Sequence, residues 1–387
     1  MRAYSILVLA FFMSCFMLSV HRGLSLARWA KSSRTGRRLV GFKEGATRIL
    51  IGRRHFSRME DHDGTDFDSR VQETYDRVLG MRMIVSESNE KVKLVKNLQL
   101  KKRRDKEGLI LLEGHRQVID ALRYGVAPRN IFITDKGIDG PMGYSLMEAI
   151  TFSGEAAGDS GEDLFRKIDV VSDTLMKKCF SEVETAQGLV AAFKRPNRES
   201  YLHRIKEKES SSNANALVVF LDHVSDPGNM GTLIRSSFGF GADTMILTGG
   251  CDPWSPKVIR SAMGMGLQIP IIETAGWSDQ LLDILAEPSP SQMGSLFPLL
   301  EQANQDYQIL VADMSADATP YYDVDFTKPT MVVVGSEARG PSPEVLGLPN
   351  AKKIYIPMAR DLESLNAAVA GSVILSEAAR QRGSNRV

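Results

Sequence analysis

The sequence predicts an α/β protein with two folded domains, the second built on a mostly parallel sheet. In both halves of the chain, short apolar runs typical of strands alternate with patterns typical of helices. The first run of the second half, "LVVFLD", reads as a fully apolar strand, as in parallel sheets covered on both faces. A polar segment at 196–216, with a Ser/Asn run and room for a short helix, predicts a linker. We therefore expect one domain at 84–195 and another at 217–387.

The composition is that of a soluble globular protein, with 43% hydrophobic and 25% charged residues among 387. Cys15, Cys179 and Cys251 lie far apart, so the sequence predicts neither a disulfide framework nor a metal site. Residues 1–58 hold twelve Lys/Arg and one acid, which leaves 36 basic and 46 acidic residues for the rest. Because the body is acidic, any nucleic acid must be bound by a local basic surface.

Residues 1–58 have the composition of a removable targeting segment. The apolar run "YSILVLAFFMSCFMLSV", residues 4–20, is marginal in length for a membrane span and suits the apolar region of a signal peptide. The following "RGLSLARWAKSSRTGRRLVGF" is rich in Arg and Ser and poor in acids, as in organelle transit peptides. We expect a mitochondrial address. A plastid signal-plus-transit arrangement and a retained membrane anchor are the alternatives.

The first domain is expected to follow an acidic, flexible joint at 59–83. The runs "LILLEG", "NIFIT" and "GLVAAFK" predict buried strands, and "HRQVIDALRYG" predicts a helix that ends at Gly125. The stretch "DVVSDTLMKKCF" predicts a strand and then a helix, with Ser172 or Asp173 as its N-cap. This alternation predicts a small α/β sandwich.

The second domain continues the alternation with more apolar runs. The predicted strands are "LVVFLD", "TMILTG", "QIPIIE", "QILVAD", "TMVVVGS" and "KIYIPM". Helices are expected from about Gly231, around "SPKVIRSAMG", around "SDQLLDIL" and over "LNAAVAGSVILSEAARQR", with a Pro/Ser-rich loop at 287–292.

Three polar stretches follow strands of this sheet at their carboxyl ends, where parallel sheets bind ligands. They are "DPGNMGTLIRSS", "GSEARGPSPEVL" and "IPMARDLESLNAAVAGSVILSEAARQR". Gly335 and Gly340 allow close approach of a ligand or of another backbone, and Ser364 can cap a helix that starts near Leu365. Each stretch alone is compatible with an ordinary turn, and Arg235 alone with a surface charge. Their combination carries the functional hypothesis.

The combination resembles the three motifs of the SpoU (TrmH-like) branch of the SPOUT RNA methyltransferases. The match covers 217–382, with "GNMGTLIR", "GSEARG" and "IPM…ESLNAAVAGSVILSE" in the order and spacing of that family. The first domain resembles the L30e-like substrate-binding domain of the family, in "KVKLVKNLQLKKRRDKEGLILLEGHRQVIDAL" and "VSDTLMKKCFSEVETAQGLVAAF".

The resemblance implies that the second domain is knotted as a trefoil, binds S-adenosylmethionine and forms homodimers that complete one site across the interface. It implies that the cofactor is held by Gly335, Gly340, Ile356, Met358 and Leu365. It implies that the catalytic site is formed by Asn229, Arg235, Glu337, Ser364 and Asn366, of which Asn229 and Arg235 face the RNA. No metal is implied.

Transfer of a methyl group from a sulfonium to a ribose 2′-hydroxyl chiefly requires alignment of donor and acceptor. A guanidinium stays protonated, so we expect Arg235 to hold the phosphate beside the target ribose and to stabilise the developing oxyanion. The turn at 227–229 is expected to direct Arg235 into the cleft.

A basic segment, "VKLVKNLQLKKRRDKEG", precedes the first strand and predicts one amphipathic helix that ends near Gly108. A solvated helix face is the alternative to a binding surface. Because the body is otherwise acidic and the segment lacks aromatic residues, we expect it to contact RNA phosphates without base stacking. With Lys91, which directly precedes it, the segment has eight basic residues: Lys91, Lys93, Lys96, Lys101, Lys102, Arg103, Arg104 and Lys106.

The expected function is 2′-O-ribose methylation of large-subunit ribosomal RNA in an organelle, mitochondria first, at a guanosine. A tRNA methyltransferase with the same motifs and a non-catalytic RNA-binding ribosome-assembly factor are the alternatives. A pure binding protein has no need of all five catalytic residues, which favours the enzyme. A Rossmann-type methyltransferase is excluded, because no glycine-rich turn follows the first strand.

Overall fold

The computed structural model describes residues 71–74, 76–78, 80–81, 83–156, 162–180, 188–196, 216–274, 308–348, 351–360, 362 and 364–383. The expected targeting segment at 1–58 lies outside these residues. So do most of the predicted linker, the helix expected around "SDQLLDIL" and the loop at 287–292. Within the described part of the chain, no helix combines the length and apolar character needed to cross a membrane.

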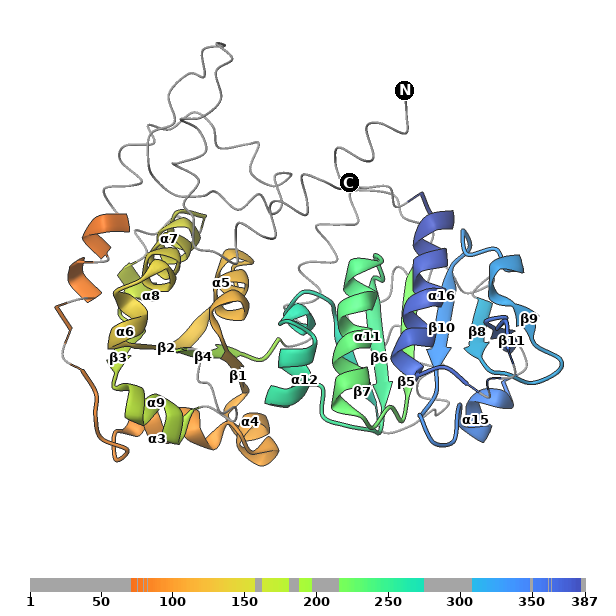
Figure 1. Ribbon diagram of the computed structural model, residues 1–387, viewed down its shortest axis with the longest axis horizontal. Coiled ribbons are helices and arrows are strands. Elements are labelled where there is room, and N and C mark those ends of the chain that lie inside the picture. Colours follow the sequence, from red (N-terminus) through yellow and green to blue (C-terminus); the bar gives the residue numbers. More distant parts are fainter. Residues whose placement is uncertain are drawn as a thin grey trace, which may run out of the picture. The chain divides into compact units, whose positions relative to one another are not determined.

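A four-stranded mixed sheet forms the centre of the first domain (Figure 1). Its strand order is β1-β4-β2-β3, in which β4 runs antiparallel to β1 and β2 while β2 and β3 are parallel. All four strands correspond to predicted ones. They are β1 (Leu109–Glu113), β2 (Pro128–Thr134), β3 (Ile168–Val171) and β4 (Leu189–Lys194).

Helices cover both faces of this sheet, with α3 and α9 on one face and α5 and α7 on the other (Figure 1). Ser172 caps α9 by accepting the N–H of Leu175 at 3.2 Å, which decides between the two predicted caps. Helix α7 has no counterpart among the predicted elements, because its glycines obscure the helical pattern. The helices are α3 (Glu90–Asn97), α4 (Lys101–Glu107), α5 (His115–Arg123), α6 (Asp135–Ile138), α7 (Pro141–Ala156), α8 (Glu162–Phe165) and α9 (Asp173–Cys179).

The basic segment forms two helices, α3 and α4, where the sequence predicts one. Its apolar residues do not share one helical face, because Leu98 is fully buried whereas Leu100 is 61% exposed. The helical structure is interrupted between α3 and α4. At the start of α3, Asn89 is the cap and accepts the N–H of Lys91 at 2.9 Å. The expected end at Gly108 is confirmed, since this glycine adopts the left-handed conformation (φ 61°) that closes α4.

The structure also differs from the prediction at the end of the expected flexible joint. Residues 71–74 and 76–78 are helical, and Val71 and Val78 are fully buried in the core of the first domain. The guanidinium of Arg77 lies 3.9 Å from the ring centroid of Phe165. These buried apolar side chains and this cation–π contact fasten the end of the joint to the domain.

The second domain contains a seven-stranded parallel sheet in the order β7-β6-β5-β10-β8-β11-β9. Six strands confirm the predicted ones, and the two-residue β9 is additional. The strands are β5 (Leu217–Asp222), β6 (Thr244–Thr248), β7 (Ile271–Thr274), β8 (Gln308–Ala312), β9 (Thr319–Pro320), β10 (Thr330–Val334) and β11 (Ala351–Tyr355).

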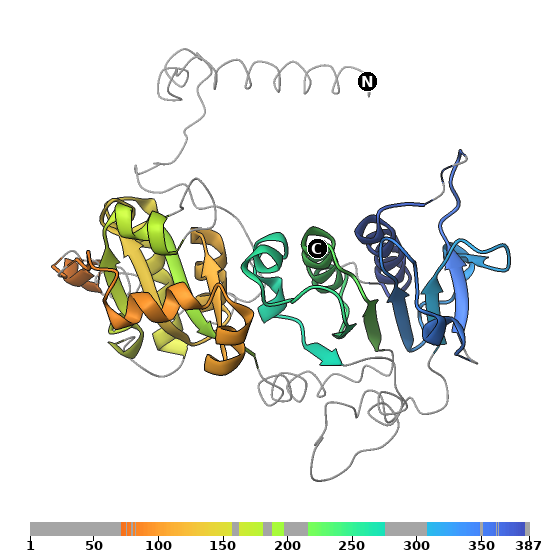
Figure 2. The ribbon, with the colours of Figure 1, turned by 90° about the horizontal axis from the view of Figure 1, so that it is seen from below.

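Helices α11 (Pro227–Gly239) and α16 (Ala367–Gln381) lie side by side against this sheet (Figures 1 and 2). Ser236 of α11 and Ser372 of α16 share a hydrogen bond of 2.7 Å between their hydroxyls. The shorter helices are α12 (Pro256–Ser261) and α15 (Pro343–Leu346), with 3₁₀ turns η2 (Met265–Leu267) and η3 (Tyr321–Asp323).

Helix α11 begins four residues earlier than predicted, so 227–229 form its first turn rather than a separate turn. Asp226 is the N-cap and accepts the N–H of Asn229 at 2.8 Å. Pro227 occupies the first helical position, where a missing N–H costs nothing. The cap and the proline outweigh the weak helix preference of Gly228.

Gly231 lets α11 approach α12 at backbone distance. A Cβ at this position would lie 2.3 Å from Cβ of Ser261 and 2.8 Å from the backbone nitrogen of Ala262. Gly239, at the end of the same helix, has no atom within 4 Å of a Cβ. The two glycines of one helix therefore have opposite packing requirements.

We predict that Gly231→Ala lowers the free energy of unfolding by about 1–3 kcal/mol, because the added methyl group forces α11 and α12 apart. Gly239→Ala is the matched control and should be neutral or stabilising by up to about 1 kcal/mol. Urea denaturation of both variants measures the difference. Equal stabilities would contradict the close helix contact.

Candidate functional site

The loops after β8, β10 and β11 of the second domain meet around one cleft of about 450 Å³ at the carboxyl edge of the sheet. The volume lies in the range of small-molecule sites. Its lining brings together eight of the ten residues that the sequence assigns to catalysis and cofactor binding: Gly335, Glu337, Gly340, Ile356, Met358, Ser364, Leu365 and Asn366. Asn229 and Arg235 are not part of the lining.

The wall of the cleft after β10 is backbone packed on backbone. A Cβ at Gly335 would lie 2.2 Å from the nitrogen of Pro341 and 2.3 Å from the carbonyl carbon of Gly340. Gly340 has a φ of 67°, in the left-handed region. The loop from Gly335 to Gly340 can curl back on itself because both of its ends are glycine.

A series of side-chain hydrogen bonds connects the segments that follow β5, β10 and β11. Nδ2 of Asn229 donates to Oε1 of Glu337 at 2.9 Å, and Nδ2 of Asn366 donates to Oδ1 of Asn229 at 2.9 Å. Asn229 thus contacts two residues of the lining without lining the cleft itself. Asn229, Glu337 and Asn366, three of the residues expected to be catalytic, are therefore brought together.

Asn366 rather than Ser364 caps the last helix. Its Oδ1 accepts the N–H groups of Ala368 at 3.0 Å and Val369 at 3.2 Å, so α16 begins at Ala367. The predicted cap at Ser364 and start near Leu365 are wrong by two residues. Because Ser364 is released from capping, its exposed hydroxyl lies in the cleft lining.

Glu337 is held by several donors from the loop after β5. The backbone N–H groups of Ser225 and Asp226 donate to its carboxylate at 3.3 Å each, and the Ser225 hydroxyl donates at 3.2 Å. Partial burial alone raises the pKa of Glu337, but these hydrogen bonds and that from Asn229 outweigh it. The net result is a pKa below the ordinary glutamate value, so Glu337 is an anion at neutral pH.

Arg235 does not point into the cleft of its own chain, which corrects the expectation from the turn at 227–229. It lies on the exposed side of α11 and forms no hydrogen bond or ion pair with another described residue. Asn229 and Arg235 both belong to α11 and are six residues apart. Because this spacing is not a whole number of helical turns, Arg235 lies on a different face of α11 from Asn229. Ser236, by contrast, packs on α16.

The cleft includes residues that the sequence analysis did not single out, among them Asp313 and Met314 after β8. The Ser315 hydroxyl donates to Asp313 at 2.7 Å, which orients the carboxylate. Asp313 is the last residue of the predicted strand "QILVAD" and Met314 follows it, and this position at the carboxyl edge was the available signal. Asp313 is a second carboxylate in the lining, beside Glu337.

The mixture of lining groups suits a ligand with apolar and polar parts. Apolar walls come from Val334, Ile354, Ile356, Met358 and Leu365. The lining also contains the polar side chains of Asp313, Glu337, Ser364 and Asn366. A small organic cofactor fits this lining.

The expected RNA-facing residues fall into three classes. On α3, Lys91 pairs with Asp169 at 2.8 Å, Lys93 with Glu90 at 2.8 Å and Lys96 with Glu87 at 3.5 Å. On α4, four residues are exposed and form no ion pair with another described residue: Lys101, Lys102, Arg103 and Lys106. The cations available for phosphate therefore concentrate on α4.

Arg104 forms the third class, and its assignment as an RNA-facing residue is wrong. It is only 3% exposed and donates to the carbonyl oxygens of Leu98 and Gln99 at 2.7 Å each. It also pairs with Asp252, which belongs to the second domain. A buried cation needs such partners, so Arg104 is a structural residue between the domains.

We predict that Asn229→Ala raises the pKa of Glu337, because burial, which favours the neutral acid, then meets fewer opposing hydrogen bonds. Since the wild-type pKa is depressed, the hydrogen bonds of the anion stabilise the loop above the ordinary carboxyl pKa and are lost as the pH falls through the lowered value. Carbon NMR titration of labelled glutamate measures the shift. Asn366→Ala is the control, because Asn366 donates to Asn229 and not to Glu337. If the pKa of Glu337 is unchanged in Asn229→Ala, the hydrogen bond from Asn229 does not help to outweigh the effect of burial.

Two family models match the chain, one for each domain. The model described as "SpoU rRNA Methylase family" matches residues 216–288 and 287–376. The model described as "MRM3-like substrate binding domain" matches residues 89–191.

Proteins with similar sequences are named as rRNA methyltransferases. "rRNA methyltransferase 3A, mitochondrial" of Danio rerio is 30% identical over 303 residues, which are 72% of this chain and 65% of that protein. "23S rRNA (uridine(2479)-2'-O)-methyltransferase" of Streptomyces viridochromogenes is 33% identical over 177 residues, 44% of this chain and 54% of that protein. The chain thus spans less than two thirds of the length of either relative.

A solved structure supports the same assignment. The AdoMet-bound rRNA methyltransferase from Sinorhizobium meliloti is 25% identical with a TM-score of 0.56, over 77% of this chain and 97% of that one. Together with the parallel sheet and the separate first domain, this likeness confirms the SPOUT fold class. The similarity to mitochondrial rRNA methyltransferase 3 proteins is confirmed as well. The second domain is thus a SpoU methylase domain, and the first domain, ahead of it, is an MRM3-like substrate-binding domain.

Proposed function

We propose that the protein transfers a methyl group from S-adenosylmethionine to a ribose 2′-hydroxyl of mitochondrial large-subunit ribosomal RNA. The observation that carries this proposal is the convergence of the second and third motif stretches on one cleft, to which Asn229 of the first is joined by its hydrogen bonds with Glu337 and Asn366. Such a convergence provides a reaction site as well as a binding site. It favours an enzyme over a non-catalytic assembly factor.

The cleft fits S-adenosylmethionine. When bound, this cofactor supplies a methyl group already activated on a sulfonium. The residues that we assign to holding it are Gly335, Gly340, Ile356, Met358 and Leu365, all of which line the cleft. The AdoMet in the solved structure of the Sinorhizobium meliloti relative supports S-adenosylmethionine as the cofactor.

The remaining cleft residues orient the target ribose. The Ser364 hydroxyl and the Asn366 amide can form hydrogen bonds with it, and Glu337 adds a fixed negative charge nearby. Because Glu337 is held by Asn229 and by two backbone N–H groups, its carboxylate is fixed before substrate arrives. We assign these residues to alignment.

We propose that Arg235 acts in a site completed by a second copy of the chain. It is exposed on α11 and lies outside the cleft of its own chain. Apolar side chains on the same pair of helices are also exposed, with Phe238 of α11 at 37% and Val369 of α16 at 48%. A homodimer that covers these helices would bury that apolar surface and bring Arg235 to a partner's cleft.

The exposed cations of α4, namely Lys101, Lys102, Arg103 and Lys106, are proposed to contact RNA phosphates. The mitochondrial matrix is the proposed location, supported by the composition of residues 1–58 and by the name of the Danio rerio relative. We propose a guanosine as the target. The Streptomyces relative is named for a uridine, so mapping of the modified nucleotide must decide the base.

The test is a methyl-transfer assay with labelled S-adenosylmethionine, in which mitochondrial large-subunit rRNA and a tRNA pool compete. We expect label at one alkali-resistant ribose of the rRNA, because a 2′-O-methyl group blocks cleavage there. Label in tRNA instead would transfer the proposal to the tRNA substrate. Label in neither RNA, with cofactor binding intact, would support the assembly factor.

Gly335→Ala is the inactive control for this assay. Its methyl group overlaps the backbone of Gly340 and Pro341, so we expect loss of S-adenosylmethionine binding by calorimetry and of all methyl transfer. Gly266→Ala serves as the matched variant, since a Cβ there meets only ordinary contacts of 3.4 Å or more.

We predict that Arg235→Lys lowers kcat on the order of 100-fold although the charge is kept, because an ammonium cannot reproduce the two-pronged contact of a guanidinium with a phosphate. S-adenosylmethionine affinity should not change, since Arg235 lies outside the cleft. Arg380→Lys, at an exposed arginine of α16 paired with Glu377, is the control. Near-normal turnover of Arg235→Lys would exclude the proposed role.

A further inference from the structure

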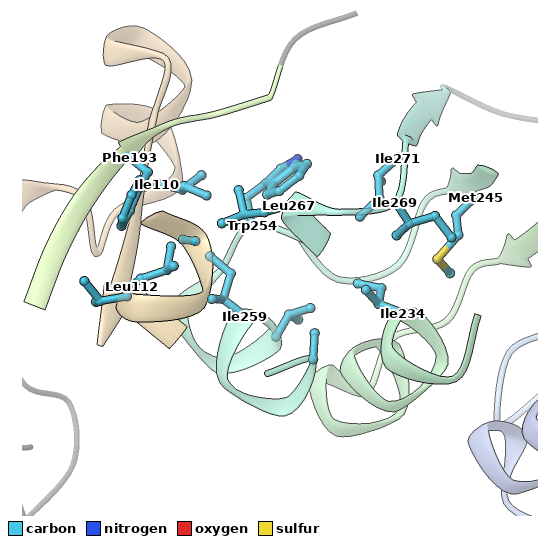
Figure 3. Close-up of a cluster of buried hydrophobic side chains, with 14 of the residues drawn as sticks. Ile110, Leu112, Phe193, Ile234, Met245, Trp254, Ile259, Leu267, Ile269 and Ile271 are labelled. Carbon is cyan, nitrogen blue, oxygen red and sulfur yellow. The ribbon is translucent and has the colours of Figure 1, made fainter. Parts of the chain in front are cut away.

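The two domains share a buried apolar contact. Ile110, Leu112 and Phe193 of the first domain face Trp254, Ile259 and Leu267 of the second (Figure 3). Each of the six side chains is at most 6% exposed. The same burial that stabilises a domain core therefore holds the two domains together.

Arg104 lies beside this contact and joins α4 to the loop after β6. Its guanidinium has two backbone carbonyl acceptors on its own domain and the Asp252 carboxylate on the other. The second oxygen of Asp252 accepts the N–H of Trp254 at 2.9 Å, which fixes the carboxylate. Because both terminal nitrogens of Arg104 are engaged by these acceptors, its guanidinium cannot turn outward to a phosphate.

A second arginine repeats the arrangement. Arg195, at the end of the first domain, pairs with Asp105 of α4 at 2.8 Å and with Glu273 of β7. Glu273 also accepts the indole N–H of Trp254 at 3.0 Å. Residues of α4 are thus tied to the second domain at two points, both next to Trp254.

The loop that carries Asp252 is itself bonded to the loop of the first motif. The N–H of Cys251 donates to the carbonyl of Val224 at 3.0 Å, and the N–H of His223 donates to the carbonyl of Thr248 at 2.8 Å. Val224 lies two residues before Asp226, the N-cap of α11. A continuous set of contacts therefore runs from α4 to the loop before α11, whose Ser225 and Asp226 N–H groups donate to Glu337.

We propose that Arg104 and Asp252 are positioning residues that hold the exposed cations of α4 at a fixed distance from the cleft, and that this distance selects the nucleotide to be methylated. The proposal rests on the proposed function, RNA methylation. Phosphate contacts fix the register of an RNA but carry no sequence information. A rigid connection converts that register into a choice of ribose, since a small misplacement is enough to prevent reaction.

Asp252→Asn tests the proposal. The variant keeps the oxygen that accepts the N–H of Trp254 and removes the charge opposite Arg104. We expect methylation at the wild-type nucleotide to fall on the order of 100-fold, with new methylation at neighbouring riboses and unchanged S-adenosylmethionine affinity. Lost stability alone would lower the total signal without moving it to other nucleotides. Glu273→Gln is a second variant that loosens the same contact through Arg195.

Arg103→Gln is the matched control, because Arg103 is the exposed neighbour of Arg104 on α4. This change should weaken RNA binding and reduce its salt dependence while leaving the methylated nucleotide unchanged. If Arg104 bound RNA directly, Asp252→Asn would free its guanidinium and strengthen binding. That result, or methylation by Asp252→Asn only at the wild-type nucleotide and at the normal rate, would overturn the proposal.

A distance measurement separates this proposal from the proposed function. Fluorophores on unnatural amino acids at exposed Thr174 of α9 and Glu344 of α15 report the distance between the domains. We expect a narrow distribution in the wild-type protein and a broad one in Asp252→Asn. A broad wild-type distribution would overturn the fixed distance even if the RNA is methylated. A wild-type protein that methylates no RNA would instead refute the proposed function, whatever the distance.

Discussion

The hydrogen-bond chain Asn366–Asn229–Glu337 is the interaction on which the site depends, because it joins residues 137 and 108 positions apart in sequence. Each side-chain amide in this series uses its oxygen as an acceptor and its nitrogen as a donor. Asn366 accepts from the backbone of α16 and donates to Asn229, which in turn donates to Glu337. Reversal of either amide would place donor against donor or acceptor against acceptor. The start of α16, the loop after β10 and the first turn of α11 therefore hold one another in place.

Close backbone contact is the second constraint, and glycine provides it. Gly335 lets the loop after β10 fold onto Pro341, which shapes one wall of the cleft, and Gly231 lets α11 pack directly on α12. Since α11 carries both Asn229 and Arg235, the packing of its buried face determines where its polar residues lie. Gly231, which lies outside the cleft lining, thus helps to decide the geometry of residues assigned to contact a ligand.

The distribution of charge shows how burial changes the role of one residue type. Lys101, Lys102 and Arg103 are exposed on α4, whereas Arg104 of the same helix is buried and shared between the domains. On α3 each lysine of the basic segment has an acidic neighbour. Of the eight basic residues in the segment, four on α4 combine exposure with the absence of an ion pair to any described residue. The local basic surface expected of an acidic protein is smaller than the sequence suggests.

The sequence by itself determined the alternation of strands and helices, the parallel second sheet and the three motif stretches, because periodicity and strand-end position are local properties. It also identified eight of the residues that line the cleft. Only the tertiary structure decided that Asn366 caps α16, that Asp313 joins the lining, that Arg235 faces outward and that Arg104 is buried. Neighbouring residues of a helix lie on different faces. Which of these faces is buried depends on packing against elements that are far away in the chain.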